Sequence, residues 1–277
     1  MVAAQEKVMG RFAFGKNWQS YLERVNDARI EKAVQSLRDM LAVETLKGKR
    51  FLDIGCGSGL FSLAAQRLGA EVTSFDYDLD SVEATSSMKN VHAPDAKNWT
   101  VQQGDVLDDD FVQGLGEFDV VYSWGVLHHT GQMWPAIEKA IARVAPGGKF
   151  FIALYNDQGG NSRRWKVIKK LYVHSPSWLK MVVVWAVILY FELRYALVRL
   201  LRFKNPFPDW KKDEQEQLRG MSMWHDYVDW VGGYPFEVAK PDEVFSFCKT
   251  RRLELEKLIT VVNSHGCNEY VFSRKNI

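Results

Sequence analysis

The sequence predicts an α/β protein in which helices cover both faces of a mostly parallel sheet, with a block of extra helices inserted in the chain. Between about residues 50 and 156, short apolar runs alternate with helical periods, which is the pattern of successive βαβ units. The alternation then stops, and residues 157–218 read as helices. A chain of 277 residues suffices for one large domain that carries such an insertion.

The alternating part is predicted to contain five strands. Each strand is a short apolar run, and a helical period follows three of the first four. In chain order these segments are FLDI (51–54), a helix through 60–69, EVTSFD (71–76), a helix over 79–89, WTVQQGD (99–105), FDVVYSW (118–124), a helix over 133–144 and KFFIALYN (149–156).

The chain closes with two further apolar runs behind a predicted helix over residues 241–252. These runs, LELEKLITVV (253–262) and CNEYVFS (267–273), have a short connection that predicts a hairpin. One strand must therefore be antiparallel to the rest. The predicted domains are an N-terminal helical lid segment (1–47), a core (48–156 and 241–277) and an inserted helical substrate cap (157–240).

The predicted insertion is both apolar and basic. Its run MVVVWAVILYF (181–191) is bracketed by Lys180 and Arg194, which makes it too short for a membrane span, so we expect a helix laid over the core. Residues 160–204 hold ten Lys and Arg against one acid, Glu192, whereas the rest of the chain has 26 bases against 33 acids.

Three interpretations of this charge remain open. The insertion is a lid whose charges face solvent, a site for an anionic or amphipathic acceptor, or a surface for peripheral contact with an anionic membrane. Nucleic acid is not an expected partner, because the block is too apolar for a groove that follows phosphates.

The composition predicts a cytoplasmic protein. The first residues lack the apolar core of a signal peptide. The three cysteines, Cys56, Cys248 and Cys267, are widely spaced, which argues against a disulfide framework or a zinc cluster.

The first strand leads directly into a glycine-rich turn, Gly55-Cys56-Gly57-Ser58-Gly59, which opens a helix. Glycines allow a tight turn and the close approach of a ligand, and open α/β sheets bind ligands at this end of their strands. A dinucleotide-binding fingerprint would require Gly or Ala where this chain has Leu60.

Three carboxylates end neighbouring strands. Asp53 would repel a pyrophosphate and suits a cationic ligand, Asp76 lies where an acid grips ribose hydroxyls, and Asp105 is placed to meet an adenine amino group. This set describes a site for an adenosine that carries positive charge and no phosphate.

The segments LDIGCGSG, FDYD, GDV, FDVVYSWGVLHH and PGGKFFIALY resemble, as an ordered set, the motifs of class I S-adenosylmethionine-dependent methyltransferases. The resemblance covers about residues 48–156 and the closing hairpin. It implies a doubly wound, seven-stranded, Rossmann-like sheet with an antiparallel C-terminal hairpin. It also implies S-adenosyl-L-methionine as cofactor and S-adenosyl-L-homocysteine as product.

The resemblance implies that Asp53 and the glycine loop hold the methionine part, Asp76 the ribose, and Asp105 with Val106 the adenine. The region RFAFGKNWQSY (11–21) resembles a lid segment of the family. Its aromatic residues, or Trp124, either face the sulfonium or pack in the core. The expected cofactor-binding residues are Asp53, Gly55, Cys56, Gly57, Gly59, Leu60, Asp76, Tyr77, Asp105, Val106, Trp124 and Trp18.

The expected catalytic residues are His129, His128, His225 and Tyr155. In the family, the loop after the fourth strand often carries a His at the second place of an LHH-like sequence, and His129 matches that place. His225, in the dense segment MSMWHDYVDWVGGYP (221–235), is the alternative base, and a structural role remains open for each. No metal is predicted, because these residues have no recognised ligand spacing.

The predicted function is transfer of a methyl group from S-adenosylmethionine to a small-molecule acceptor. Oxygen is the preferred target, because a histidine base helps most when the nucleophile is a hydroxyl. Methylation of a small thiol or of nitrogen is the alternative, and a non-catalytic nucleotide-binding scaffold is the alternative of another class. Leu60 and Asp53 oppose a third reading, an NAD-dependent oxidoreductase.

Overall fold

In the computed structural model, residues 25–203, 205, 223–262 and 266–275 are described, without the side chains of 223–226 and 229. The chain forms two compact units. Among the described residues, those up to Ser162 and those from Glu237 onward make the first, which we call the sheet unit. Residues from Arg163 to Phe236 belong to the second, which we call the helical unit.

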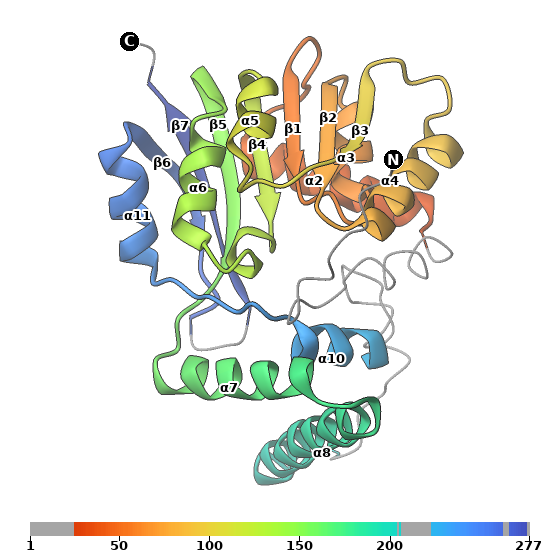
Figure 1. The fold of residues 1–277 in the computed structure, drawn as a ribbon, viewed down its shortest axis with the longest axis vertical. Coiled ribbons are helices and arrows are strands. Elements are labelled where there is room, and N and C mark those ends of the chain that lie inside the picture. The colour runs from red at the N-terminus through yellow and green to blue at the C-terminus, as the bar shows by residue number, and fades with distance from the viewer. Residues whose placement is uncertain (1–24, 204, 206–222, 263–265, 276–277) are drawn as a thin grey trace. The chain divides into compact units, whose positions relative to one another are not determined.

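The sheet unit contains one seven-stranded sheet with the order β3-β2-β1-β4-β5-β7-β6 (Figure 1). The five strands from β1 to β5 pair in parallel, and β7 pairs antiparallel with both β5 and β6. This confirms the predicted fold class. The strands are β1 (Arg50–Ile54), β2 (Glu71–Asp76), β3 (Trp99–Gln103), β4 (Phe118–Trp124), β5 (Val144–Tyr155), β6 (Leu253–Ile259) and β7 (Cys267–Arg274).

Helices pack on both faces of the sheet, because alternate strand residues are apolar on both sides. On one face, Leu52 and Ile54 of β1 join a buried cluster with residues of α6 and α11. On the other, Phe51 lies next to Tyr122, and Phe61 of α3 stacks on the same tyrosine with ring centroids 5.2 Å apart. The helices of this unit are α2 (Asp27–Leu41), α3 (Leu60–Arg67), α4 (Leu79–His92), α5 (Asp109–Gly114), α6 (Met133–Ile141) and α11 (Pro241–Thr250), with the 3₁₀ helix η1 (Leu127–His129).

Strand β5 begins earlier than the sequence predicted. Val144 already pairs with Phe118, and the register then shifts before Lys149 pairs with Val120. Gly148 lies in the shifted segment, and a Cβ atom there would come within 2.9 Å of the Ala145 carbonyl oxygen. The glycine thus serves an irregularity inside the strand, in a segment that the sequence pattern placed before the strand.

The other boundary differences are small. The third strand ends at Gln103 and the sixth at Ile259, where longer runs were predicted. Helix α5 was not predicted at all. Its N-cap is Asp108, whose side chain accepts a hydrogen bond from the Phe111 N–H.

The helical unit is built from α7 (Gly160–His174), most of which belongs to it, with α8 (Ser177–Leu201) and α10 (Met223–Gly232). Trp165 of α7 stacks on Phe191 of α8 with centroids 5.7 Å apart, and also contacts Trp230 of α10. These aromatic contacts form the small core of the unit.

Helix α8 corrects the expectation that the apolar run 181–191 is too short to span a membrane. The helix has 25 residues, because helical backbone continues through the charged positions on both sides of the run. By length and composition it could cross a membrane. Of its residues, Val184 and Val187 are buried, and its placement over the core stays a prediction.

Candidate functional site

The strand order places two loops of the sheet unit against each other. The chain runs from β1 outward to β3 and then returns to β4, on the other side of β1. Ligands of open α/β sheets bind at such a switch point, beyond the carboxyl ends of the strands. Here the glycine loop after β1 meets the loop after β4: a Cβ atom on Gly55 would lie 2.4 Å from a methyl carbon of Val126.

The glycine loop has a backbone that ordinary residues rarely adopt. Gly55, Gly57 and Gly59 have φ angles of 76°, 54° and 79°. Thr85 of α4 stabilises the loop, because its hydroxyl donates a hydrogen bond to the Gly57 carbonyl at 3.1 Å. A side chain at Gly59 would come within 2.9 Å of Thr85. The loop therefore keeps its backbone bare and closely packed, as a ligand cradle requires.

Asp53 is a buried carboxylate at the end of β1. Its Oδ2 accepts a hydrogen bond from the Ser62 hydroxyl at 2.5 Å, and Ser62 in turn contacts the Ser74 hydroxyl. The pKa of Asp53 is raised to about 7, chiefly by burial; the Ser62 hydrogen bond lowers it and the charge of Asp76 raises it. Among the described residues, no basic side chain forms an ion pair with Asp53.

Asp76 ends β2 and holds the glycine loop through backbone hydrogen bonds. Its two oxygens accept from the N–H groups of Gly57, at 3.1 Å, and Asp78, at 2.9 Å. Burial raises the pKa of Asp76 to about 6, and these two hydrogen bonds oppose the rise. Burial and the two acids also raise the pKa of the Cys56 thiol, so this cysteine remains protonated.

The remaining residues predicted for the cofactor lie at the same edge of the sheet. Asp105 follows β3, and its Oδ1 accepts from the Leu107 N–H at 2.9 Å, beside the buried Val106. Tyr77 follows β2 and is exposed, and Trp124 ends β4 and is partly buried. Leu60 begins α3 and is buried.

The two histidines differ in exposure although they are adjacent. His128 is fully buried, and its ring centroid lies 4.1 Å from that of Tyr155 at the end of β5. His129 is partly exposed, and its ring stands perpendicular to the Tyr155 ring at 5.4 Å. The fold thus brings His128, His129 and Tyr155 together from two neighbouring strand ends.

A short segment that sequence reasoning missed fastens this group. The Glu237 N–H donates to the His128 carbonyl, and the Ala239 N–H donates to the Tyr155 carbonyl, each at 3.0 Å. The Glu237 carboxylate also accepts from the Met133 N–H at the start of α6, at 3.0 Å. These contacts join residues more than 80 positions apart, so no local pattern could have indicated them.

Two predicted residues are not placed at this site. Trp18 lies outside the described residues. His225 belongs to α10 of the helical unit, and its side chain is likewise not described. In the described part of the chain, no group of three or more His, Cys, Asp or Glu is arranged to hold a metal ion.

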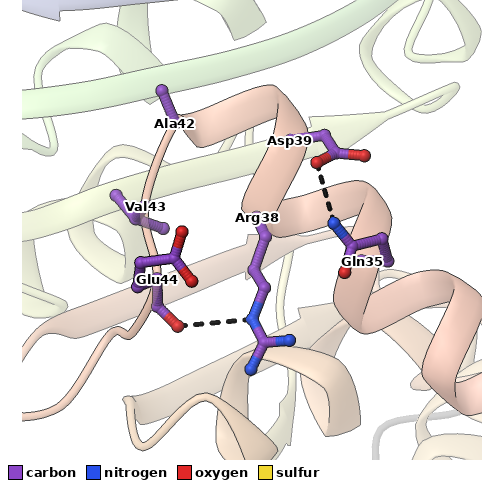
Figure 2. A pocket seen from close by; sticks show the side chains of 6 residues that line it. All are labelled: Gln35, Arg38, Asp39, Ala42, Val43 and Glu44. Carbon is purple, nitrogen blue, oxygen red and sulfur yellow. Dashed lines mark hydrogen bonds between the residues drawn. The ribbon is translucent and has the colours of Figure 1, made fainter.

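Elsewhere in the sheet unit, a hollow of about 290 Å³ lies at the C-terminal end of α2 (Figure 2). Figure 2 shows the side chains of Arg38 and Gln35 engaged in hydrogen bonds, with the Glu44 carbonyl and Asp39 respectively. The hollow contains none of the predicted site residues and consists of one helix end and its turn.

The arrangement at the switch point fits a cationic adenosine ligand. Asp53 is buried with its charge uncompensated by any described basic group, so a positively charged ligand would lower the cost of its ionisation. The bare glycine backbone beside it leaves room for close approach, and Asp76 and Asp105 lie at the next two strand ends.

Comparison with known proteins agrees with this geometry. Residues 21–201 match the family described as methyltransferase domain. The ubiquinone biosynthesis O-methyltransferase of Methylobacterium sp. (strain 4-46) is 36% identical over 120 residues, 43% of this chain and 46% of that protein. The protein of the same name from Mesorhizobium japonicum is 32% identical over 133 residues, 48% of this chain and 51% of that protein. The match thus spans about half the length of these relatives.

A solved structure extends the likeness of fold to almost the whole chain. The magnesium protoporphyrin IX methyltransferase of Synechocystis PCC 6803, crystallised with bound SAH, has a TM-score of 0.54 and 13% identity, and 94% of each chain is covered. The matched family covers well over half of the 277 residues and includes the glycine loop, the three acids and both histidines. The chain therefore belongs to the methyltransferase domain family.

Proposed function

We propose that the protein transfers a methyl group from S-adenosylmethionine to a hydroxyl group of a small molecule. The observation that carries this proposal is that the glycine loop, the buried Asp53 and the partly buried Asp76 lie at the switch point together with the His128, His129 and Tyr155 group. The names of the relatives, ubiquinone biosynthesis O-methyltransferases, favour oxygen as the target. Hydroxylated intermediates of that biosynthesis are the first acceptors to test.

The residues of the sheet unit have separate tasks in this proposal. S-adenosylmethionine supplies a methyl group already activated on a sulfonium. Asp53 and the Gly55–Gly59 backbone hold its methionine part, Asp76 its ribose hydroxyls, and Asp105 with Val106 its adenine. Tyr77, Leu60, Cys56, Trp124 and Trp18 complete the proposed contacts. The protein aligns the acceptor oxygen with the methyl carbon and excludes water.

His129 is the proposed base. It takes the proton of the acceptor hydroxyl while the oxygen–carbon bond forms, and the sulfur keeps the electron pair of the bond that breaks. Its partial exposure supports this choice over His128, which is buried against Tyr155 and supports the loop. Tyr155, together with Asn156 and Asp157, contacts the acceptor.

Turnover and cofactor affinity, measured separately, test the proposal. His129→Ala should lower kcat by about 10²–10⁴-fold, the usual contribution of a general base, with the Kd for S-adenosylhomocysteine nearly kept. Asp76→Ala should weaken that Kd by about tenfold or more, because a charged hydrogen-bonding partner of the ribose is lost. His92→Ala, at the end of α4, is the matched control and should change neither quantity.

The outcomes separate the alternatives. If His129→Ala keeps its turnover, His129 is not the base. The acceptor is then a thiol, which ionises by itself, or an amine, or else the base is His225. Titration calorimetry that detects no cofactor binding to the wild-type protein would overturn the enzyme proposal. Binding without turnover on any acceptor would leave the non-catalytic scaffold.

The proposal assigns residues 157–240 to a cap over the acceptor and residues 1–47 to a lid segment, with residues 48–156 and 241–277 as the cofactor-binding core. An anionic or amphipathic acceptor suits the basic and apolar composition of the cap. The proposal also includes peripheral contact of residues 160–204 with the cytoplasmic side of a membrane.

A further inference from the structure

We infer that α8 is an in-plane anchor whose exposed apolar face docks on an anionic lipid bilayer. The inference rests on the membrane contact included in the proposed function and names its surface and its lipid. The observations that carry it are an unbroken exposed apolar stripe, a fixed opposite face and a large surplus of basic side chains.

The stripe runs the length of α8. Its members recur every three or four positions, which puts them on one side of a helix, and each is more than half exposed. They are Trp178, Val182, Trp185, Leu189, Leu193, Leu197 and Leu200. A contiguous apolar surface of this length on a folded unit marks a site of contact with a lipid or protein surface.

The opposite side of α8 is held by protein, which favours in-plane binding over a membrane span. Val184 and Val187 are buried on this side, and Phe191 stacks on Trp165 of α7. Glu192, at the edge of the stripe, accepts a hydrogen bond from the Tyr227 hydroxyl of α10 at 3.3 Å. A spanning helix would have to remove these contacts and carry Glu192 into the hydrocarbon, at a cost of several kcal/mol. Binding through the stripe alone leaves both contacts intact.

Charge favours an anionic bilayer over a second copy of this chain. Residues 160–204 carry ten basic residues against one acid, so two copies joined through this surface would repel each other. An anionic lipid surface attracts the same charge, with each basic residue near it worth about fivefold in affinity. Arg194 is exposed on α8 and Arg202 at its C-cap, and Tyr190 and Tyr195 of α8 are exposed with rings that suit the bilayer interface.

Vesicle co-sedimentation of the full chain tests the inference. We expect binding to vesicles of phosphatidylcholine with phosphatidylglycerol, weaker binding to phosphatidylcholine alone, and partial release at high salt. Trp185→Glu with Leu189→Glu should weaken binding to anionic vesicles by about tenfold or more. Arg194→Glu with Arg202→Glu should weaken it by a similar factor on anionic vesicles and change little on phosphatidylcholine.

Val91→Glu is the matched control, because Val91 is 72% exposed on α4 of the sheet unit. It should bind vesicles like the wild type. The inference is overturned if the wild type ignores anionic vesicles, if Val91→Glu weakens binding as much as the stripe variant, or if alkaline carbonate fails to release bound protein, which indicates a span. It also fails if ultracentrifugation shows a dimer that Trp185→Glu dissociates.

The assay contains neither methyl donor nor acceptor, so its result is independent of the proposed methyl transfer. Each variant is accepted only if its circular-dichroism spectrum and thermal unfolding match those of the wild type. If a stripe variant fails this criterion, the wild-type protein is tested instead, by quenching of its tryptophan fluorescence with brominated anionic lipids. Quenching supports docking on the bilayer, and absence of quenching rejects docking.

Discussion

Asp53 is the residue through which pH should act on the cofactor site. Burial raises the pKa of this carboxyl to about 7, so above that pH it is ionised and attracts a cationic ligand, and below it the proton removes the attraction. We expect the Kd for S-adenosylmethionine to rise as pH falls, approaching about tenfold per pH unit below pH 7. Titration calorimetry from about pH 8 to about pH 6 measures this change in Kd.

The Asp53→Asn variant isolates that effect. It cannot ionise, so its affinity should be low at every pH and nearly flat down to pH 6, near which Asp76 begins to take up its own proton. The stability of the free protein should depend on pH in the opposite direction from the affinity for the cofactor. A raised carboxyl pKa means that the folded state holds the proton more tightly, so stability should fall as pH rises from about 4 to 7. An Asn variant as pH-dependent as the wild type contradicts the assignment.

Gly55 combines two obstacles to the presence of any side chain, its backbone angle and a close neighbour. An alanine there combines a φ of 76° with a Cβ atom 2.4 Å from Val126, so Gly55→Ala should cost about 2–5 kcal/mol in unfolding free energy. Gly48 has a φ of 73° and no atom within 4 Å of its Cβ position. Gly48→Ala should therefore cost only the backbone part, about 1–2 kcal/mol, in the same urea titration. Equal losses in the two variants would show that the contact with Val126 is unimportant.

The sequence could predict that Gly55 belongs to a ligand loop, because the strand, the glycines and the helix are adjacent in the chain. It could not predict Val126 as its neighbour. That contact depends on β4 returning to lie beside β1, and the sequence shows the order of strands along the chain but not across the sheet. The same holds for Thr85, which supports the loop from another helix.

At the scale of elements, α6 depends on a residue from a distant part of the chain. Its N-cap, Gln132, makes no side-chain capping hydrogen bond, and the Glu237 carboxylate accepts from the first-turn Met133 N–H instead. An acid at a helix N-terminus also interacts favourably with the helix dipole. Glu237→Ala should therefore lower the unfolding free energy by about 1–2 kcal/mol, measured by urea denaturation.

Glu31→Ala is the control for that variant, because Glu31 is an exposed acid inside α2 and its replacement should change stability by less than about 0.5 kcal/mol. Glu237 also fastens the loop of His128, so its removal should reduce turnover more than it reduces cofactor affinity. Turnover and stability both unchanged in Glu237→Ala would reject the capping role.

Elements were predictable where the local pattern was regular. The strands from β1 to β4 and the C-terminal hairpin follow from apolar runs, and their ends moved by three residues or fewer. The start of β5 was missed because a strand that passes through Pro146-Gly147-Gly148 needs a register shift, which only pairing with β4 establishes. The apolar run alone underestimates the length of α8, because the helical backbone continues through the charged residues on both sides of the run.

At the scale of the molecule, the chain combines two units with different sources of stability. The sheet unit has a large buried cluster supported by seven strands. The helical unit relies on a few aromatic contacts and on Lys169, a fully buried lysine whose ammonium lies 4.3 Å from the Trp230 ring centroid and 4.9 Å from that of Phe236. Two units of this kind are expected to unfold in separate steps.

Lys169 should therefore control the stability of the helical unit alone. Its Nζ also donates to the Trp230 carbonyl, so Lys169→Ala removes a charged hydrogen bond and two cation–π contacts, a loss of about 2–4 kcal/mol. Hydrogen exchange should show reduced protection in α7 and α10 while β1, β4 and β5 keep theirs. The control is Lys170→Ala, at the exposed neighbouring position, which should leave both units protected. A uniform loss of protection would mean that the chain unfolds as one cooperative body.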